Sequence, residues 1–150
     1  MALAWHVRPF AQLSAHELYA ILALRQRVFV VEQACAYLDA DGADESSRHL
    51  WATEAGAIHA YCRLVPAGIK FTEVSIGRVI IAPEARGMGL GKELMRRALA
   101  EIGAAPVRIG AQAHLERFYG ELGFVRASEP YDEDGIPHIE MLTMPSAGGA

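Results

Sequence analysis

The sequence lacks long apolar runs and is poor in cysteine, and both absences narrow what the chain can be. None of its apolar stretches approaches the roughly 20 residues that would span a bilayer. The N-terminus has no basic segment followed by a long apolar one, so we see no signal peptide. The two cysteines, Cys35 and Cys62, have no metal-ligand spacing. We therefore expect a cytoplasmic protein with reduced thiols, no membrane contact and no bound metal.

Positive charge is also scarce. The formal net charge is −4, which argues against a nucleic-acid partner, because such a partner needs a concentrated basic face. Residues 28–47 contain no Lys or Arg, and carboxylates gather there and again near the C-terminus: Glu32, Asp39, Asp41, Asp44, Glu45, Asp132, Glu133 and Asp134. Basic residues crowd one stretch: Arg86, Lys92, Arg96 and Arg97. Separate regions of opposite charge suit an anionic cofactor and a cationic co-substrate, although solvated loops would give the same acidic pattern.

Length and composition fit one globular α/β domain. A chain of 150 residues with 52% hydrophobic content can bury one core. The apolar patterns predict strands at 2–9, 49–54, 58–65, 73–82, 107–112, 124–127 and 139–143. They predict helices from a Ser14–Glu17 capping box to about residue 30, over 89–102 and over 115–122. This order gives a mixed sheet covered by helices, in a single domain over 1–144 with a flexible tail at 145–150.

The strongest chemical signal is the glycine-rich turn Arg86-Gly87-Met88-Gly89-Leu90-Gly91-Lys92, between a predicted strand and an amphipathic helix. Glycines let backbone N–H groups approach an anion, and the helix start adds unpaired donors. A Walker loop does not fit, because the glycines lie too close together and Glu93 follows Lys92. The dinucleotide fingerprint Gly-x-Gly-x-x-Gly does not fit either, because the third glycine comes too early. Arg-x-x-Gly-x-Gly does fit, with a purely structural turn as the alternative.

Together with a second signature, this turn resembles the GNAT superfamily of N-acetyltransferases. The superfamily's central motif is Gln/Arg-x-x-Gly-x-Gly/Ala, and its later helix ends in Tyr-x-x-x-Gly-Phe, matched here by 119–124. Further segments resemble the ElaA-like branch, from about Trp5 to Met144: 27–33, 37–42, 48–50, 76–79, 110–115 and 134–139. The resemblance implies a central mixed, mostly antiparallel sheet of about seven strands, about four flanking helices and a splayed cleft between two parallel strands. It also implies a bacterial acetyltransferase with no firmly assigned acceptor.

The resemblance places acetyl-CoA along the strand before the glycine turn, with its pyrophosphate on the turn. The implied cofactor-binding residues are Val79, Ile80, Ile81, Arg86, Gly87, Met88, Gly89, Leu90, Gly91, Lys92, Gln112, His114, Phe118 and Tyr119. The implied reaction is direct attack of a primary amine on the thioester in a ternary complex. A backbone N–H of Ile80 or Ile81 would stabilise the oxyanion.

Proton transfer needs an acid for the leaving thiolate and a base for the amine. Tyr119 matches the superfamily's acid, with a packing role in the interior as the alternative. A lysine-like amine has a pKa of about 10.4, so little of it is reactive at neutral pH without a base. Ser75 stands near the position where many family members carry a Glu, and it can orient a water but cannot be the base alone. The other candidates for the base are Glu32, His49, His114 and His138.

Two acidic segments, 32–47 and 131–138, are expected to flank the acceptor side of the cleft. Both predict a cationic amine as acceptor, either a small polyamine-like molecule or a protein amine. The resemblance leaves a homodimer open, because members of the superfamily are often dimers. Two other functions stay open: a non-catalytic acetyl-CoA-binding or sensor module on the same fold, and an unrelated nucleotide-binding enzyme.

Overall fold

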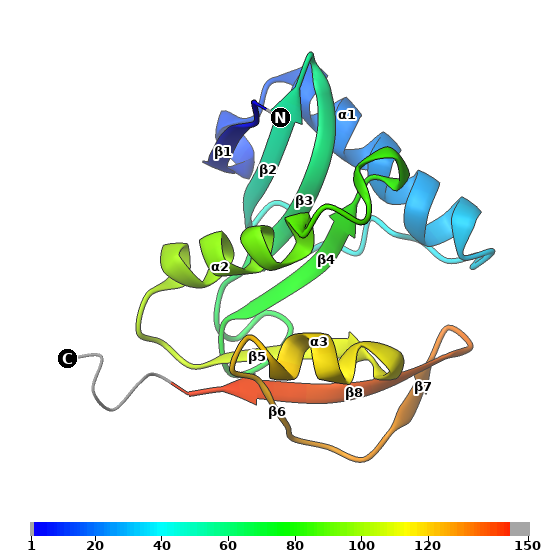
Figure 1. The fold of residues 1–150 in the computed structure, drawn as a ribbon, viewed down its shortest axis with the longest axis vertical. Helices are drawn as coiled ribbons and strands as arrows, with labels where there is room; N and C mark the ends of the chain where they lie inside the picture. The colour runs from blue at the N-terminus through cyan, green and yellow to red at the C-terminus, as the bar shows by residue number, and fades with distance from the viewer. Residues whose placement is uncertain (1, 145–150) are drawn as a thin grey trace.

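The computed structural model describes residues 2–144, and the predicted tail at 145–150 lies outside them (Figure 1). The strands are β1 (Ala4–Pro9), β2 (Arg48–Glu54), β3 (Ala57–Val65), β4 (Ser75–Ile81), β5 (Val107–Gln112), β6 (Val125–Arg126), β7 (Tyr131–Glu133) and β8 (Ile136–Thr143). The α-helices are α1 (Ala15–Arg25), α2 (Leu90–Ile102) and α3 (Glu116–Gly120), and a π-helix at Gln26–Glu32 continues α1. Within residues 2–144 no helix is long and apolar enough to cross a membrane.

Two four-stranded sheets meet at a parallel junction. Strands β1 to β4 pair antiparallel in sequence order, and β5, β8 and β6 form the second sheet with β7 on β8. A parallel bridge joins the start of β5 to the residue before β4, where the Arg108 N–H donates to the Val74 carbonyl at 2.9 Å. Beyond this bridge β4 and β5 diverge (Figure 1). The predicted mostly antiparallel sheet and the splayed cleft between two parallel strands are confirmed, with eight strands in the described chain.

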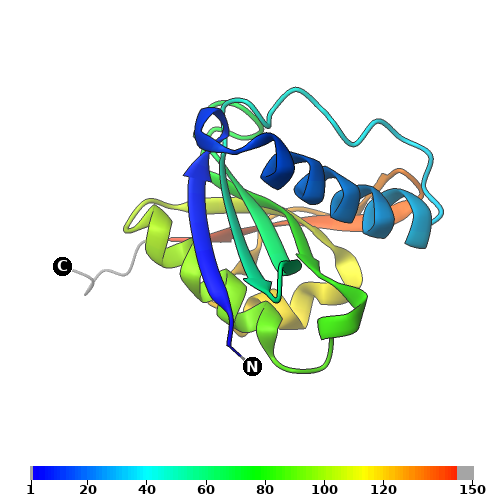
Figure 2. The ribbon, with the colours of Figure 1, turned by 90° about the horizontal axis from the view of Figure 1, so that it is seen from above.

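The first sheet is covered by helices on both faces (Figure 2). Side chains alternate along a strand, so Leu50 and Cys62 of β2 and β3 pack with α2, whereas Trp51 and Tyr61 pack with α1. The α2 face consists of Leu90, Leu94, Met95 and Ala98. Ile76 and Ile80 of β4 belong to these same two clusters, so β4, which forms one wall of the cleft, is held by the same packing.

Two segments differ from the sequence-based prediction. The first helix changes at Arg25 from α to π geometry and continues to Glu32. Such π segments are rare in proteins, and those that do occur often lie at functional sites. The acidic segment 131–138, for which the sequence predicts no strand, forms a hairpin in which Asp134 and Gly135, with φ of 53° and 81°, join β7 to β8. An Asp-Gly pair with positive φ at both positions is the usual two-residue hairpin turn, which explains why β8 begins at Ile136.

Buried ion pairs hold the irregular segment that leads into β2. Arg25 donates to Asp39 at 2.7 Å and to Asp44 at 2.6 Å. Arg63 of β3 donates to Asp44 at 2.9 Å and to Asp41 at 2.8 Å. Burial alone would raise the pKa of Asp44, but hydrogen bonds from the two arginines outweigh it and lower that pKa. The Asp44 carboxylate is therefore ionised and paired with both arginines.

Two further cations complete this network at the edge of the cleft. Arg78 Nε donates to Asp39 at 2.7 Å, and Lys70 Nζ lies 2.8 Å from Asp41. The negative charge of Asp39, Asp41 and Asp44 is thus matched by cations of the protein itself. Contrary to the prediction, these three aspartates of segment 32–47 do not offer free negative charge to an acceptor.

We expect Asp44→Asn to lower the free energy of unfolding by about 3 kcal/mol, because Arg25 and Arg63 lose a shared buried carboxylate. Glu101→Gln is a matched control, since Glu101 pairs with Arg48 at the surface and such pairs contribute less than about 1 kcal/mol. Urea denaturation of both variants measures the difference. Equal losses would show that the buried pairs do not stabilise the fold more than a surface pair.

Candidate active site

The glycine-rich turn presents open backbone donors at the start of α2. Gly87 and Gly89 have φ of +84° and +73°, which favours glycine, and a Cβ at either position would meet open space. Gly89 directly precedes α2, and no side chain caps the helix. The first N–H groups of α2 are therefore available to an anion, and the helix dipole favours one there. This geometry fits a pyrophosphate.

The two cations of the turn both reach carboxylates. Arg86 donates two hydrogen bonds to Glu32, at 2.6 and 2.9 Å, and its Nε donates to the Ile81 carbonyl at 3.2 Å. Lys92 Nζ lies 3.0 Å from Glu121. The hydrogen bond from Arg86 lowers the pKa of Glu32. Glu32 is thus held ionised at the glycine-rich turn, which argues against it as the base.

Glu32 occupies the guanidinium of Arg86, which a pyrophosphate would also bind, so Glu32 and the pyrophosphate compete for it. Because an exposed ion pair is weak, we expect Glu32→Gln to tighten acetyl-CoA binding only about threefold and to leave kcat within about twofold. Glu84→Gln is the control, since Glu84 pairs with Arg27 instead. Calorimetric titration with acetyl-CoA measures the affinity. A loss of kcat of about 100-fold would instead identify Glu32 as the base.

Strand β4 carries a bulge in its pairing with β3. The register against β3 shifts around Arg78, which has φ of +52°. The Ala82 N–H donates to the His59 carbonyl of β3 at 2.9 Å. Backbone groups alternate along a strand, so the N–H of Ile81 points toward the cleft and that of Ile80 toward β3. Of the two predicted oxyanion donors, the geometry favours Ile81.

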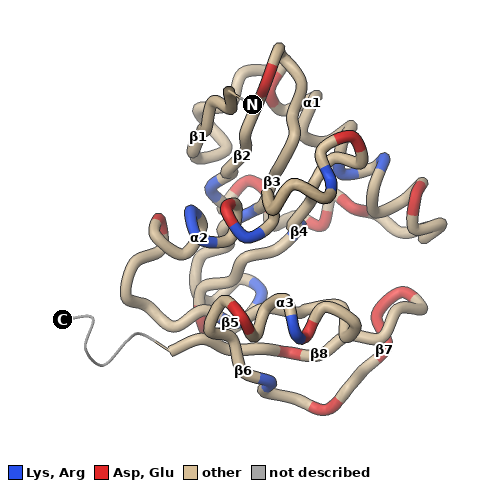
Figure 3. The backbone as a smooth tube through the Cα atoms, in the orientation of Figure 1, with Lys and Arg blue, Asp and Glu red and all other residues tan. Residues whose placement is uncertain are grey.

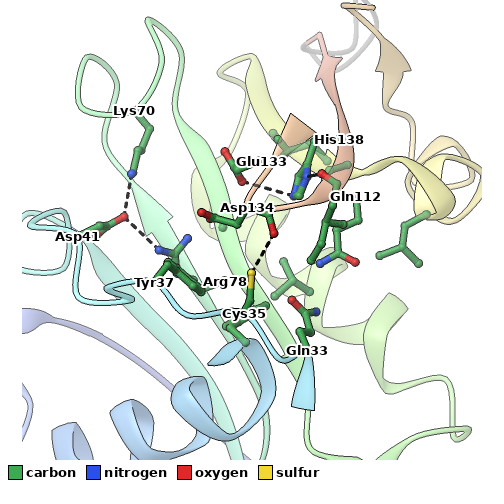
Figure 4. Close-up of a pocket in the computed structure, with 18 of the residues that line it drawn as sticks. Gln33, Cys35, Tyr37, Asp41, Lys70, Arg78, Gln112, Glu133, Asp134 and His138 are labelled. Atoms are coloured by element: carbon green, nitrogen blue, oxygen red, sulfur yellow. Dashed lines mark hydrogen bonds and ion pairs between the residues drawn. The ribbon is translucent and has the colours of Figure 1, made fainter. Parts of the chain in front are cut away.

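A cavity of about 310 Å³ opens where β4 and β5 diverge (Figure 4). Residues 76–79 of β4 and 109–112 of β5 form its strand walls. Segment 33–41 and the β7–β8 hairpin also line it, and the Cys35 thiol donates to the Asp134 carbonyl at 3.1 Å where these two meet. The volume lies at the small end of the range for small-molecule sites, about 300–1,000 Å³.

Tyr119 of α3 lines this cavity. Its ring packs edge-on against Phe118 and Phe124, with ring centroids 5.0 and 5.9 Å away. Burial raises the pKa of Tyr119 to about 12. The hydroxyl therefore keeps its proton at neutral pH, as an acid for a leaving thiolate must. Phe118 also lies against the start of α2, since a Cβ on Gly91 would come within 3.3 Å of its ring.

His138 of β8 is the candidate base that the structure places in the cavity. The ring is buried, and Nδ1 lies 2.7 Å from the Ile136 carbonyl. A carbonyl only accepts, so Nδ1 carries the proton and Nε2 is the unprotonated nitrogen of the neutral ring. Tyr131 stacks on the ring, and Glu133 lies 3.4 Å from Nε2, where it can pair with the protonated form. His138 thus has the geometry of a base.

Three other candidates lie outside the cavity lining. Ser75 is buried at the start of β4, before the stretch that lines the cavity. His49 is buried and bonded to the Tyr61 hydroxyl at 2.7 Å and the Asp44 carbonyl at 3.0 Å, which is a structural role. His114 is exposed in the turn before α3. The geometry therefore supports neither Ser75 as a water-orienting residue nor His114 as a group in this cavity.

The cavity joins residues with a predicted role to residues without one. Among the predicted residues, Val79, Gln112, Tyr119 and His138 line it. Side chains without a predicted role also line it: Cys35, Tyr37, Lys70 and Arg78. Across residues 2–144, no group of three or more His, Cys, Asp or Glu side chains could hold a metal ion.

A cleft between two splayed parallel strands, with a glycine-rich turn after one of them, is the arrangement that the GNAT resemblance implies for an acyltransferase. The family model for the acetyltransferase (GNAT) domain matches residues 15–144, and the chain belongs to this family. It is 42% identical to protein ElaA of Escherichia coli over 143 residues, which cover 91% of this chain and 94% of that protein.

A UPF0039 protein of Synechocystis is also 42% identical, over 147 residues that cover 95% of this chain and 96% of that one. The crystal structure of an acyl-CoA N-acyltransferase from Pseudomonas aeruginosa matches with a TM-score of 0.91 at 45% identity, covering 95% of this chain and 99% of that one. The resemblance to the GNAT superfamily and its ElaA-like branch is therefore confirmed.

Proposed function

We propose that this protein is an N-acetyltransferase that moves the acetyl group of acetyl-CoA to a primary amine by direct attack in a ternary complex. The observation that carries this proposal is one cavity, beside the free edge of β4, lined by both Tyr119 and His138. The Cys62 thiol is a poor alternative as nucleophile. Cys62 is fully buried, and burial raises the pKa of its thiol.

Acetyl-CoA supplies the acetyl thioester, and residues of this chain supply the rest. The uncapped start of α2, with Arg86 and Lys92, holds the pyrophosphate. The free backbone groups of β4 hold the pantetheine amides as an added strand would. The Ile81 N–H stabilises the oxyanion, and the Tyr119 hydroxyl gives its proton to the leaving sulfur.

The acceptor side supplies the base and negative charge. An amine arrives mostly as ammonium, because its pKa of about 10.4 lies well above neutral pH. Glu133 and Asp134 line the cavity beside His138, so they attract this cation, whether it belongs to a small amine or to a protein. His138 Nε2 then accepts a proton from the ammonium, and the neutral amine attacks.

Thiol release from acetyl-CoA in the presence of a panel of amines tests the proposal. We expect release that depends on both acetyl-CoA and an amine, with the acetylated amine confirmed by mass spectrometry. Thermal shift with acetyl-CoA, CoA, ATP and NAD runs beside it, because only a specific ligand in excess stabilises the fold by mass action. Stabilisation by acetyl-CoA without transfer to any amine would favour the sensor function. Stabilisation by ATP or NAD alone would favour a nucleotide-binding enzyme.

A further inference from the structure

The cavity has two walls of opposite charge (Figure 4). Lys70 and Arg78, with Asp41 between them in the network, lie on one side. Glu133 and Asp134 of the β7–β8 hairpin lie on the other, beside His138. Opposite charges on the two walls suit a ligand that carries both a positive and a negative group.

The first wall is cationic despite its aspartates. Three carboxylates, Asp39, Asp41 and Asp44, meet four cations, Arg25, Arg63, Arg78 and Lys70, so the network carries one surplus positive charge. Arg25 and Arg63 are only 0% and 1% exposed. The side chains of Arg78 and Lys70 are 20% and 41% exposed and line the cavity. The surplus charge is therefore presented to the cavity by these two residues.

Arg78 and Lys70 also retain donors for a ligand. Arg78 bonds Asp39 and Asp41 through Nε and Nη2, and within residues 2–144 its Nη1 has no hydrogen-bond partner. The Lys70 ammonium has three hydrogens and contacts only Asp41 among the described carboxylates. The rings of Phe29 and Tyr37 lie 5.9 and 5.8 Å from the Arg78 guanidinium and hold it in place. An anionic group on a ligand would find charge-assisted donors here.

The opposite wall keeps free negative charge. Within the described chain Asp134 makes no ion pair, and Glu133 pairs only with His138, at 3.4 Å. An ammonium bound at this wall lies next to the nitrogen that removes its proton. An anionic group bound at the first wall would orient the amine toward the base, whereas a second ammonium there would face Arg78 and Lys70.

Building on the proposed function, we propose that the acceptor is a small zwitterion, a primary amine that also carries a carboxylate, of the amino-acid class. The carboxylate binds Lys70 and Arg78, and the amine binds at Glu133 and Asp134 beside His138. The cavity of about 310 Å³ suits a molecule of this size. A polyamine is disfavoured, because its second charge has the wrong sign for the first wall.

Matched acceptors test the carboxylate requirement. For each of several side chains, an amino acid is compared with its carboxamide and its decarboxylated amine, for example leucine, leucinamide and 3-methylbutylamine, in the thiol-release assay. We expect kcat/KM to be at least about tenfold higher for the best amino acid than for its two analogues, since a charge-assisted contact is lost in both. Amides or amines acetylated as well as the amino acids would overturn this inference and leave the proposed function standing.

A variant of the cationic wall gives an independent readout. Lys70→Met is expected to raise KM about tenfold for the amino acid and less for its decarboxylated amine. Arg126→Met, which removes a cation of similar exposure (43%) outside the cavity lining, is the control and should raise neither KM. The inference would be overturned if KM changed equally for the amino acid and its decarboxylated amine, or equally in Lys70→Met and Arg126→Met. Absence of transfer to every acceptor, with acetyl-CoA still bound, would overturn the proposed function itself.

Discussion

Tyr119→Phe is expected to lower kcat by about 100-fold or more and to leave acetyl-CoA affinity near its original value, because only a proton donor is removed. The ring packs against Phe118 and Phe124, and phenylalanine keeps both contacts. The fold and the glycine turn are therefore undisturbed. Steady-state thiol release gives kcat, and calorimetric titration with acetyl-CoA gives the affinity.

The pKa of Tyr119, raised by burial to about 12, adds a pH criterion. A general acid must be protonated to act. At any pH below about 11 Tyr119 keeps its proton, so wild-type activity should not fall there through its ionisation. Tyr19→Phe is the control, because Tyr19 is exposed on α1 and does not line the cavity. Full activity in Tyr119→Phe would show that this tyrosine only packs, and the acid would then have to be sought elsewhere.

The glycine turn could be predicted from sequence because its chemistry is local. Positive φ at Gly87 and Gly89 and an uncapped helix start follow from consecutive residues. The turn at Asp134-Gly135 is equally local, but the sequence-based prediction treats segment 131–138 as an acidic loop beside the cleft and not as a hairpin. The Asp-Gly pair is itself a hairpin signal, and it accounts for β7.

Charge pairing could not be predicted in the same way, because the partners lie far apart in the chain. Arg86 meets Glu32 across 54 positions, and Arg78 meets Asp39 across 39. A run of aspartates without nearby cations therefore looked free in the sequence, although the fold neutralises it. The choice among candidate bases depended on the fold too, since only the register of the β7–β8 hairpin places His138 at the cavity.

His138→Gln is expected to lower kcat by about 100-fold at pH 7, because the ammonium loses its proton acceptor. Glutamine can still donate a hydrogen bond but cannot take up a proton at this pH. The matched control is His114→Gln, since His114 is exposed and lies outside the cavity lining. Urea denaturation of both variants shows whether the fold is retained.

The pH dependence of this defect separates a base from a residue that only shapes the cavity. As pH rises toward the acceptor's pKa, about 10.4 for a lysine-like amine, more of the amine is neutral before it binds. A missing base then matters less, so the ratio of wild-type to variant kcat/KM should fall steadily between pH 7 and pH 9. A cavity distorted by the substitution would give a ratio that does not change with pH. The same measurement therefore distinguishes proton transfer by His138 from packing against Tyr131 and Glu133.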